Sequence, residues 1–149
     1  PIRRRVRRRS AAAGGHLRHR RLWHLGNVPG VTVTGFVPDL NAALNRSQVF
    51  AAPLRFAAGV QNKVLEAMAT ARPVVTTALV NEGLRAVPGQ QILIADDASS
   101  TAQQIVALLQ DEDLRVRIGH AGLAFVREKY SWERAVDRMR HIEAQLGTG

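Results

Sequence analysis

Residues 59–77 bring together a glycine, a polar helix start, a carboxylate and a strand that begins after a proline. The segment opens Gly59-Val-Gln-Asn-Lys-Val-Leu-Glu66, and the β-branched run Val-Val-Thr-Thr follows Pro73. The first turn of a helix leaves backbone N–H groups free at the positive end of the helix dipole, where a pyrophosphate can bind. Gly59 carries no side chain that would block its approach, and Glu66 can accept hydrogen bonds from ribose hydroxyls. This order of loop, helix and strand is suited to holding a nucleotide.

Further residues at neighbouring positions could contact the same ligand. Lys63 lies at the helix start and can meet a phosphate as a point charge. Arg55 follows the end of a predicted strand, which is where open α/β sheets bind ligands, and a guanidinium suits a phosphate. The turn that begins at Gly35 also follows a predicted strand. The candidate ligand-binding residues are therefore Gly35, Phe36, Val37, Arg55, Gly59, Val60, Gln61, Asn62, Lys63 and Glu66.

Each of these residues also has a structural interpretation. A lone glutamate on an amphipathic helix is more often a surface charge, and a lysine at a helix start is more often simply solvated. The turn at Gly35 is equally well a plain strand-to-helix connection with Phe36 packed inward. For Glu66, the preceding glycine and the following Pro-Val-Val strand favour the ligand role.

The elements that would position these residues alternate along the chain. Short β-branched or apolar runs predict strands at residues 31–34, 48–52, 74–77 and 92–95. Helices are predicted after Asp39, over residues 62–71, after Ser99 or Ser100, from Asp113, and from Ser131. Strands that alternate with helices imply an α/β fold whose parallel sheet carries helices on both faces.

An ordered set of motifs spans roughly residues 28–146. The set contains Val31-Thr-Val-Thr-Gly35-Phe-Val-Pro-Asp39, Pro53-Leu-Arg55, Gly59, Lys63-Val-Leu-Glu66-Ala-Met-Ala, Pro73-Val-Val-Thr-Thr77, Glu82-Gly83-Leu84 and Tyr130-Ser-Trp132. Together these motifs resemble the donor-binding half of the group 1 glycosyltransferases of GT-B architecture. The resemblance implies a Rossmann-like domain at residues 28–149, the C-terminal half of such an enzyme.

The resemblance also implies a chemistry. A hexose would pass from a UDP- or GDP-sugar to a lipid-linked or polysaccharide acceptor, with the diphosphate stabilised by the helix N-terminus and basic side chains. The sequence has no Asp-x-Asp motif for a metal-bound diphosphate, so neither a metal nor a further cofactor is expected. In this family the turn at Gly35, Phe36 and Val37 commonly presents backbone groups to the nucleobase.

Two departures from the family pattern bear on catalysis. Many retaining members carry two glutamates separated by seven residues, whereas the position eight before Glu66 is Ala58. The catalytic residue is therefore left unassigned. The acceptor-binding N-terminal domain of the family is also missing from the 149 residues, so the chain is expected to be a donor-binding domain without its acceptor domain.

Charge sets the N-terminal segment apart. Nine of the 21 basic residues lie within residues 1–21, before the first acidic residue, Asp39, and the other 12 balance the 12 acidic residues. The entire net charge of +9 therefore belongs to a basic arm at residues 1–27, predicted to be disordered or non-native in sequence. Phosphate contacts by this arm would make the chain a nucleic-acid-binding module, but no aromatic residue precedes Trp23, which makes nucleic acid an unfavoured partner.

Other composition features narrow the class further. The chain has no cysteine, which excludes disulfides and thiolate metal sites. No apolar run approaches the ~20 residues needed to span a bilayer, so a cytoplasmic location is expected, with peripheral membrane association through the acceptor. A non-catalytic or epimerase-like nucleotide-sugar-binding domain of the same architecture remains the alternative to a transferase.

Overall fold

The computed structural model describes residues 23–130, and the chain divides into two compact units, Pro1–Pro38 and Asp39–Gly149. Most of the basic arm and the helix predicted from Ser131 lie outside the described residues. Each unit is described by itself below.

In the first unit the described residues form one short 3-10 helix, η1, at Trp23–Asn27. The prediction of a strand at residues 31–34 is wrong, because this segment has no ladder of hydrogen bonds. Val31 and Val33 are 43% and 38% exposed. A strand requires a second strand that pairs with its N–H and C=O groups, and no described residue forms one here; the N–H of Val31 donates instead to the carbonyl of Val28, in a turn.

The second unit is built on a three-stranded parallel sheet of order β1-β2-β3. Its strands are β1 at Phe50–Ala52, β2 at Val74–Thr76 and β3 at Leu93–Ile94. Phe50 pairs with Val74, and Thr76 pairs with Ile94. The three predicted strands of this unit are thus confirmed, each shorter than predicted.

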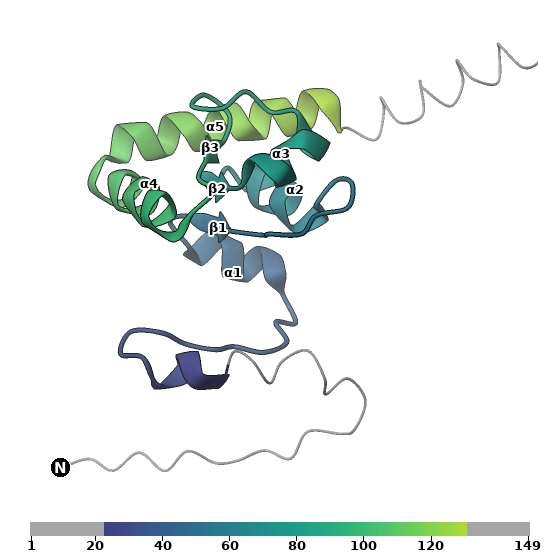
Figure 1. Cartoon of the computed structure of the whole chain (residues 1–149). Helices are drawn as coiled ribbons and strands as arrows, with labels where there is room; N and C mark the ends of the chain where they lie inside the picture. Colours follow the sequence, from purple (N-terminus) through teal and green to yellow (C-terminus); the bar gives the residue numbers. More distant parts are fainter. Residues whose placement is uncertain (1–22, 131–149) are drawn as a thin grey trace, which may run out of the picture. The chain divides into compact units, whose positions relative to one another are not determined.

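Within the described residues of this unit, five helices pack around the sheet. They are α1 at Leu40–Arg46, α2 at Asn62–Ala69, α3 at Ala78–Leu84, α4 at Ala98–Gln110 and α5 at Glu112–Lys129. Figure 1 shows α2 and α4 on opposite sides of β2. The alternation of side chains along β2 explains this arrangement, since Val74 packs in one apolar cluster with α2 and Val75 packs in a second cluster with α4. The predicted α/β fold with helices on both faces is confirmed.

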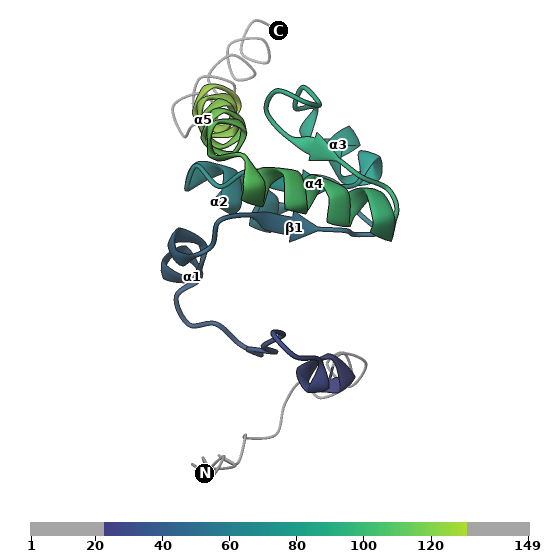
Figure 2. The same ribbon diagram turned by 90° about the vertical axis from the view of Figure 1, so that its left-hand side faces the viewer.

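The long helix α5 contributes to both clusters. Ile118, in its first half, packs with Val75 and Leu108, whereas Phe125, near its end, packs with Met68 and Val74. Figure 2 shows α5 end on and α4 from the side, so the two helices cross. Among the helices of residues 23–130, none has the length and apolar character that a bilayer crossing requires.

The helix starts follow the prediction only in part. Asp39 caps α1 as predicted, through a hydrogen bond of 2.8 Å from the N–H of Ala42. Two other predicted starts are wrong by two residues or more. Asp97, not Ser99 or Ser100, caps α4, and Asp111, not Asp113, caps α5. In both cases the carboxylate accepts a hydrogen bond from the N–H three residues on, as an N-cap residue does. Ser99, Ser100 and Asp113 lie two or three positions after the N-cap residue, inside the first turn.

Helix α3 was not predicted from the sequence. Thr77, which was assigned to the preceding strand, is its N-cap and accepts a hydrogen bond from the N–H of Val80. The helix has only seven residues and ends at Arg85 in the left-handed conformation. Its buried side chains, Val80 and Leu84, join the cluster that contains Met68, so tertiary packing stabilises a helix whose own sequence signal is weak.

Candidate functional site

The carboxyl ends of the three strands lie at one edge of the sheet, and polar residues follow each of them. Arg55 follows β1, Thr77 follows β2 and Asp96 follows β3. In open parallel sheets this edge is where ligands bind. Arg55 therefore lies where it was predicted to lie, just past a strand end at this edge.

Two threonines fix the chain after β1. The buried hydroxyl of Thr76 donates to the carbonyl of Ala52 at 2.8 Å, and that of Thr77 donates to the carbonyl of Leu54 at 2.9 Å. Both bonds link the end of β2 to the end of β1. They hold the first residues of the loop that carries Arg55 and leads on to Gly59.

The N-terminus of α2 differs from those of the other helices. The N-cap side chains of α1, α3, α4 and α5 each accept a hydrogen bond from a backbone N–H, whereas no backbone N–H of α2 donates to a capping side chain. The side chain of Gln61, its N-cap residue, instead donates back to the carbonyls of Ala58 and Gly59, at 3.4 and 3.5 Å. Gly59 has φ +63°, a conformation that glycine adopts without strain. The first N–H groups of α2 are therefore left without a side-chain acceptor, next to a loop that turns on a glycine.

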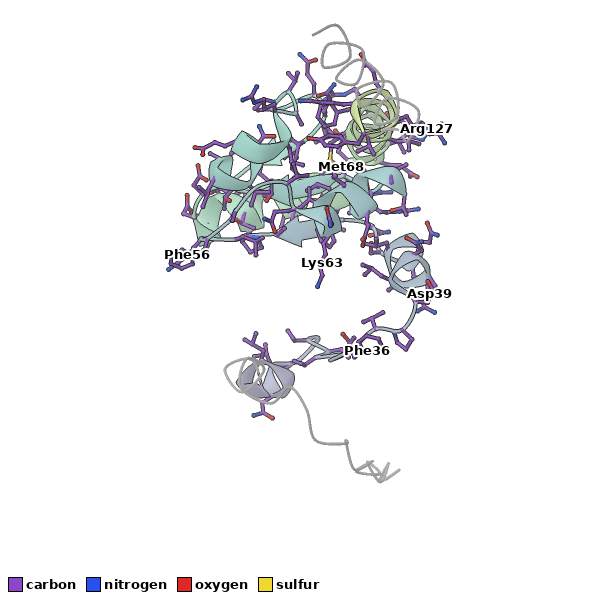
Figure 3. All side chains as sticks on the ribbon, turned by 90° about the vertical axis from the view of Figure 1, so that its right-hand side faces the viewer. Phe36, Asp39, Phe56, Lys63, Met68 and Arg127 are labelled. Atoms are coloured by element: carbon purple, nitrogen blue, oxygen red, sulfur yellow. The ribbon has the colours of Figure 1, made fainter. Side chains whose placement is uncertain are left out.

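Helix α2 separates its apolar and charged side chains cleanly. Val64, Ala67 and Met68 are fully buried, whereas Lys63 and Glu66 are exposed. Figure 3 shows Met68 inside the unit and Lys63 directed away from it. Within residues 23–130 the single ion pair joins Arg115 to Glu112, so neither Lys63 nor Glu66 is held in one. Glu66 is not part of the core.

Arg55 and the start of α2 do not line the same pocket. Arg55 lines a pocket with Asp96, Asp97 and residues of α4, and no residue of 59–66 lines this pocket. Sequence reasoning did not select the two aspartates. The signal was present, because Asp96 and Asp97 directly follow the predicted strand at 92–95 and so had to lie at the carboxyl edge of the sheet.

The remaining predicted site residues belong to the first unit. Gly35 has φ +68°, the side chain of Phe36 is 88% exposed, and Val37 is half-buried. Phe36 is therefore not packed inward in this structure. The turn exposes both its backbone and one aromatic ring.

The carboxylates of Asp96 and Asp97, at the carboxyl edge of the sheet, both accept hydrogen bonds. The backbone N–H of Ser100 donates to Asp97 at 2.9 Å and its hydroxyl donates at 2.7 Å, and these bonds lower the pKa of the Asp97 carboxyl. Asp96 accepts the N–H of Ala78 at 2.8 Å. In the described part of the chain no three His, Cys, Asp or Glu side chains gather closely enough to hold a metal ion.

Comparison with known proteins decides the family. The family model described as glycosyl transferases group 1 matches residues 2–111, which is most of the chain and includes the loop, α2 and the strands of the sheet. The chain belongs to the group 1 glycosyl transferases. The expected family is thus confirmed, and the matched range begins within the basic arm.

One relative of this group 1 glycosyl transferase has a named role. The chain is similar to the capsular polysaccharide biosynthesis glycosyltransferase CapM of Staphylococcus aureus, with 33% identity over 111 residues. The alignment covers 70% of this chain and 29% of CapM. The chain therefore spans less than a third of the length of this relative.

Proposed function

We propose that this chain binds the nucleotide-sugar donor, a UDP- or GDP-sugar, of a glycosyltransferase that elongates a lipid-linked or polysaccharide acceptor. It forms the C-terminal half of a GT-B enzyme, and a separate N-terminal domain binds the acceptor. The relative CapM, named for capsular polysaccharide biosynthesis, supports an acceptor of this class. The enzyme acts at the cytoplasmic side, and its acceptor brings it to the membrane surface.

The uncapped start of α2 is the observation that carries this proposal. An anion at this position accepts hydrogen bonds from the first N–H groups and lies at the positive end of the helix dipole. Four neighbouring helices satisfy the same groups with their own side chains, whereas α2 directs Gln61 back into the loop. A helix start that leaves these donors open is suited to the diphosphate of the donor.

The other residues take roles around this diphosphate. Lys63, exposed in the first turn, adds positive charge. Glu66 lies four residues after the first helical residue, about 6 Å further along the axis, and accepts hydrogen bonds from the ribose hydroxyls. Gly35, Phe36 and Val37 contact the nucleobase through their backbone. The developing charge on the leaving diphosphate is stabilised by these N–H groups and cations, with no metal or cofactor.

A proline substitution at the first residue of α2 tests the helix start directly. Asn62 is the first residue of α2, and its N–H has no partner within the helix. Proline is favoured at this position, and Gln61 already has the extended conformation, φ −89° and ψ 101°, that a following proline requires. Asn62→Pro is therefore expected to keep the fold. Because proline has no N–H, the variant should bind UDP and GDP more weakly than the wild type, as measured by calorimetry on the 149-residue chain.

Glu112→Pro is the matched control. Glu112 is the first residue of α5, its N-cap Asp111 is also extended, and α5 has a side-chain cap. This variant should bind UDP and GDP as the wild type does, and both variants should keep the wild-type melting temperature. Equal affinity of wild type and Asn62→Pro for both nucleotides would contradict a diphosphate site at α2.

Glu66→Gln tests the ribose contact separately. The substitution keeps the shape of the side chain but removes its charge and one acceptor. Affinity should fall by about 1.5 to 3 kcal/mol, the range of charge-assisted hydrogen bonds, with little change in stability. Glu128→Gln, at an exposed position of α5, is the control and should leave binding unchanged. Unchanged affinity in Glu66→Gln would remove this residue from the site.

A further inference from the structure

Two side chains at the end of α5 hold the C-terminal end of α3. The ammonium of Lys129 donates a hydrogen bond of 2.9 Å to the carbonyl oxygen of Leu84, and the hydroxyl of Tyr130 donates one of 3.2 Å to the same oxygen. The last carbonyls of a helix have no partner within the helix, and a cation near them also interacts favourably with the helix dipole. Helix α5 thus supplies partners that α3 lacks, across 45 and 46 positions of the sequence.

A buried aromatic ring keeps both donors in place. The Lys129 ammonium lies 5.1 Å from the centre of the Phe125 ring, within the range of cation–π contacts. The Tyr130 ring meets Phe125 edge to face, with 5.9 Å between the ring centres. Phe125 is buried in the cluster that contains Met68. The core of the unit therefore positions the two donors.

The same end of α3 touches the loop that leads into α2. Gly83 directly precedes Leu84, and a Cβ atom on it would come closer to the carbonyl oxygen of Gly59 than van der Waals contact allows. Adjacent residues of a helix move together, because the peptide bond between them is planar and rigid. Bonds that fix the carbonyl of Leu84 therefore also fix the contact between Gly83 and Gly59.

The Gly59 loop has few hydrogen bonds of its own. Among the described residues, no backbone N–H of residues 55–60 donates to a carbonyl oxygen. The side chain of Gln61 reaches the carbonyls of Ala58 and Gly59 only at 3.4 and 3.5 Å, which is long for a hydrogen bond. A loop so weakly held from within takes its position from its neighbours, and α3 is such a neighbour.

Apolar packing fixes α3 less strictly than these hydrogen bonds do. Val80 and Leu84 are fully buried, but the hydrophobic effect is non-directional, and packed helices can slide slightly against one another. Hydrogen bonds depend on distance and angle, so they restrict the same shifts. Because α3 has only seven residues, its position depends strongly on what holds its ends.

We propose that Lys129 and Tyr130 are positioning residues for nucleotide binding. By holding the end of α3, they keep Gly83 against Gly59 and so keep the loop and the start of α2 in the arrangement that accepts the diphosphate. The proposal rests on the function proposed above, but it concerns residues of a different element, neither of which is assigned to the ligand. It gives Tyr130, the first residue of the motif Tyr130-Ser-Trp132, a role toward the site.

Two conservative substitutions remove the donors and keep the packing. Tyr130→Phe deletes the hydroxyl and leaves the ring that contacts Phe125, and Lys129→Met deletes the ammonium and leaves a long unbranched side chain. Arg127→Met is the matched control for charge, since Arg127 is exposed in the same last turn and points away from the unit (Figure 3). Ile118→Val is the control for stability, because it removes a methylene from the other apolar cluster.

The first experiment needs no nucleotide and follows the backbone amide resonances of Gly59 and Val60 in the 149-residue chain. Tyr130→Phe and Lys129→Met should each shift these resonances, and the variant with both changes should shift them further. Arg127→Met and Ile118→Val should leave them in place. Unmoved resonances of Gly59 and Val60 in the variant with both changes would overturn the proposal.

The second experiment measures UDP and GDP affinity by calorimetry. The variant with both changes should bind about two- to tenfold more weakly, because the shift in loop population cannot exceed the net value of the hydrogen bonding lost. Arg127→Met and Ile118→Val should bind as the wild type does. Wild-type affinity in the variant with both changes, or an equal loss in Arg127→Met and Lys129→Met, would overturn the proposal.

A double-mutant cycle with Gly83→Ala shows whether the effect passes through α3. Once Gly83→Ala has displaced the loop, the changes at Lys129 and Tyr130 should cause no further loss of affinity, whereas independent effects would add. Full additivity would overturn the proposal. Failure of the wild type to bind either nucleotide would contradict the site at α2, and the Gly59 and Val60 resonances would then decide alone whether α5 positions the loop.

Discussion

Gly83 of α3 lies directly against the backbone of Gly59. A Cβ atom at position 83 would be 2.7 Å from the carbonyl oxygen of Gly59, 3.0 Å from its carbonyl carbon and 3.4 Å from the N of Val60. The first two distances are shorter than van der Waals contact. Helix α3 therefore supports the loop that leads into α2, and only glycine at position 83 allows the loop this close.

Gly83→Ala should displace the Gly59 loop and weaken UDP and GDP binding. Helix propensity alone would make this change stabilising by roughly 1 kcal/mol. Crowding against backbone atoms costs about 1–3 kcal/mol, so the free energy of unfolding should stay level or fall. Calorimetry and urea unfolding measure the two effects, with Glu82→Ala, at the exposed neighbouring position, as the control. A more stable variant with wild-type affinity would contradict the support by α3.

Thr76→Val should destabilise the second unit by about 0.5 to 1.5 kcal/mol, the net value of one hydrogen bond. Valine keeps the shape of the buried threonine and removes the donor to the carbonyl of Ala52. Urea unfolding measures the change. Thr70→Val is the control, since its hydroxyl donates to the carbonyl of Ala67 within the same helical turn and links no two elements. If the free energy of unfolding falls equally in both variants, the hydrogen bond between β2 and β1 stabilises the unit no more than a bond within one helical turn.

The stability conferred by Asp97 should depend on pH. Hydrogen bonds from Ser100 hold the pKa of the Asp97 carboxyl below its ordinary value of 3.8 in the folded chain, so protons bind more weakly to the folded state. The stabilisation of the folded state by the charged Asp97 carboxylate is therefore present above about pH 4 and is lost as the pH falls below that value.

Urea unfolding of wild type and Asp97→Asn at neutral and acidic pH tests this dependence. Asparagine is itself a good N-cap, so the comparison isolates the charge. The stability difference between the two proteins should shrink on acidification. Glu128→Gln should show no comparable change, because Glu128 caps no helix. If the difference in unfolding free energy between wild type and Asp97→Asn stays constant or grows as the pH falls, the charge of Asp97 does not stabilise the fold as proposed.

The 149-residue chain alone should bind the donor without transferring its sugar. Placing the acceptor next to the reacting carbon supplies much of the rate enhancement, and the proposed acceptor domain is a separate one. A radiolabelled nucleotide-sugar with a lipid-linked acceptor measures transfer. Robust, acceptor-dependent transfer by this chain would show that the acceptor site lies within it.

Local patterns in the sequence determined most of the second unit. Alternating apolar runs and helix starts predicted β1, β2, β3, α1 and α2, because burial and the capping of free N–H groups act over a few residues. The motif around Gly59 and Glu66 also indicated the family, which the match over residues 2–111 confirmed. The residues with a proposed role at α2 could therefore be selected from sequence alone.

Relationships between distant residues were decided only by the tertiary structure. The run at 31–34 has the composition of a strand but no described neighbour to pair with, and α3 forms because Val80 and Leu84 join a core assembled by other elements. The pocket joins Arg55 to Asp96, which are 41 positions apart, because parallel strands end at the same edge. Hydrogen-bonding partners, packing and shared edges depend on how the chain returns to itself, and local sequence patterns do not contain that information.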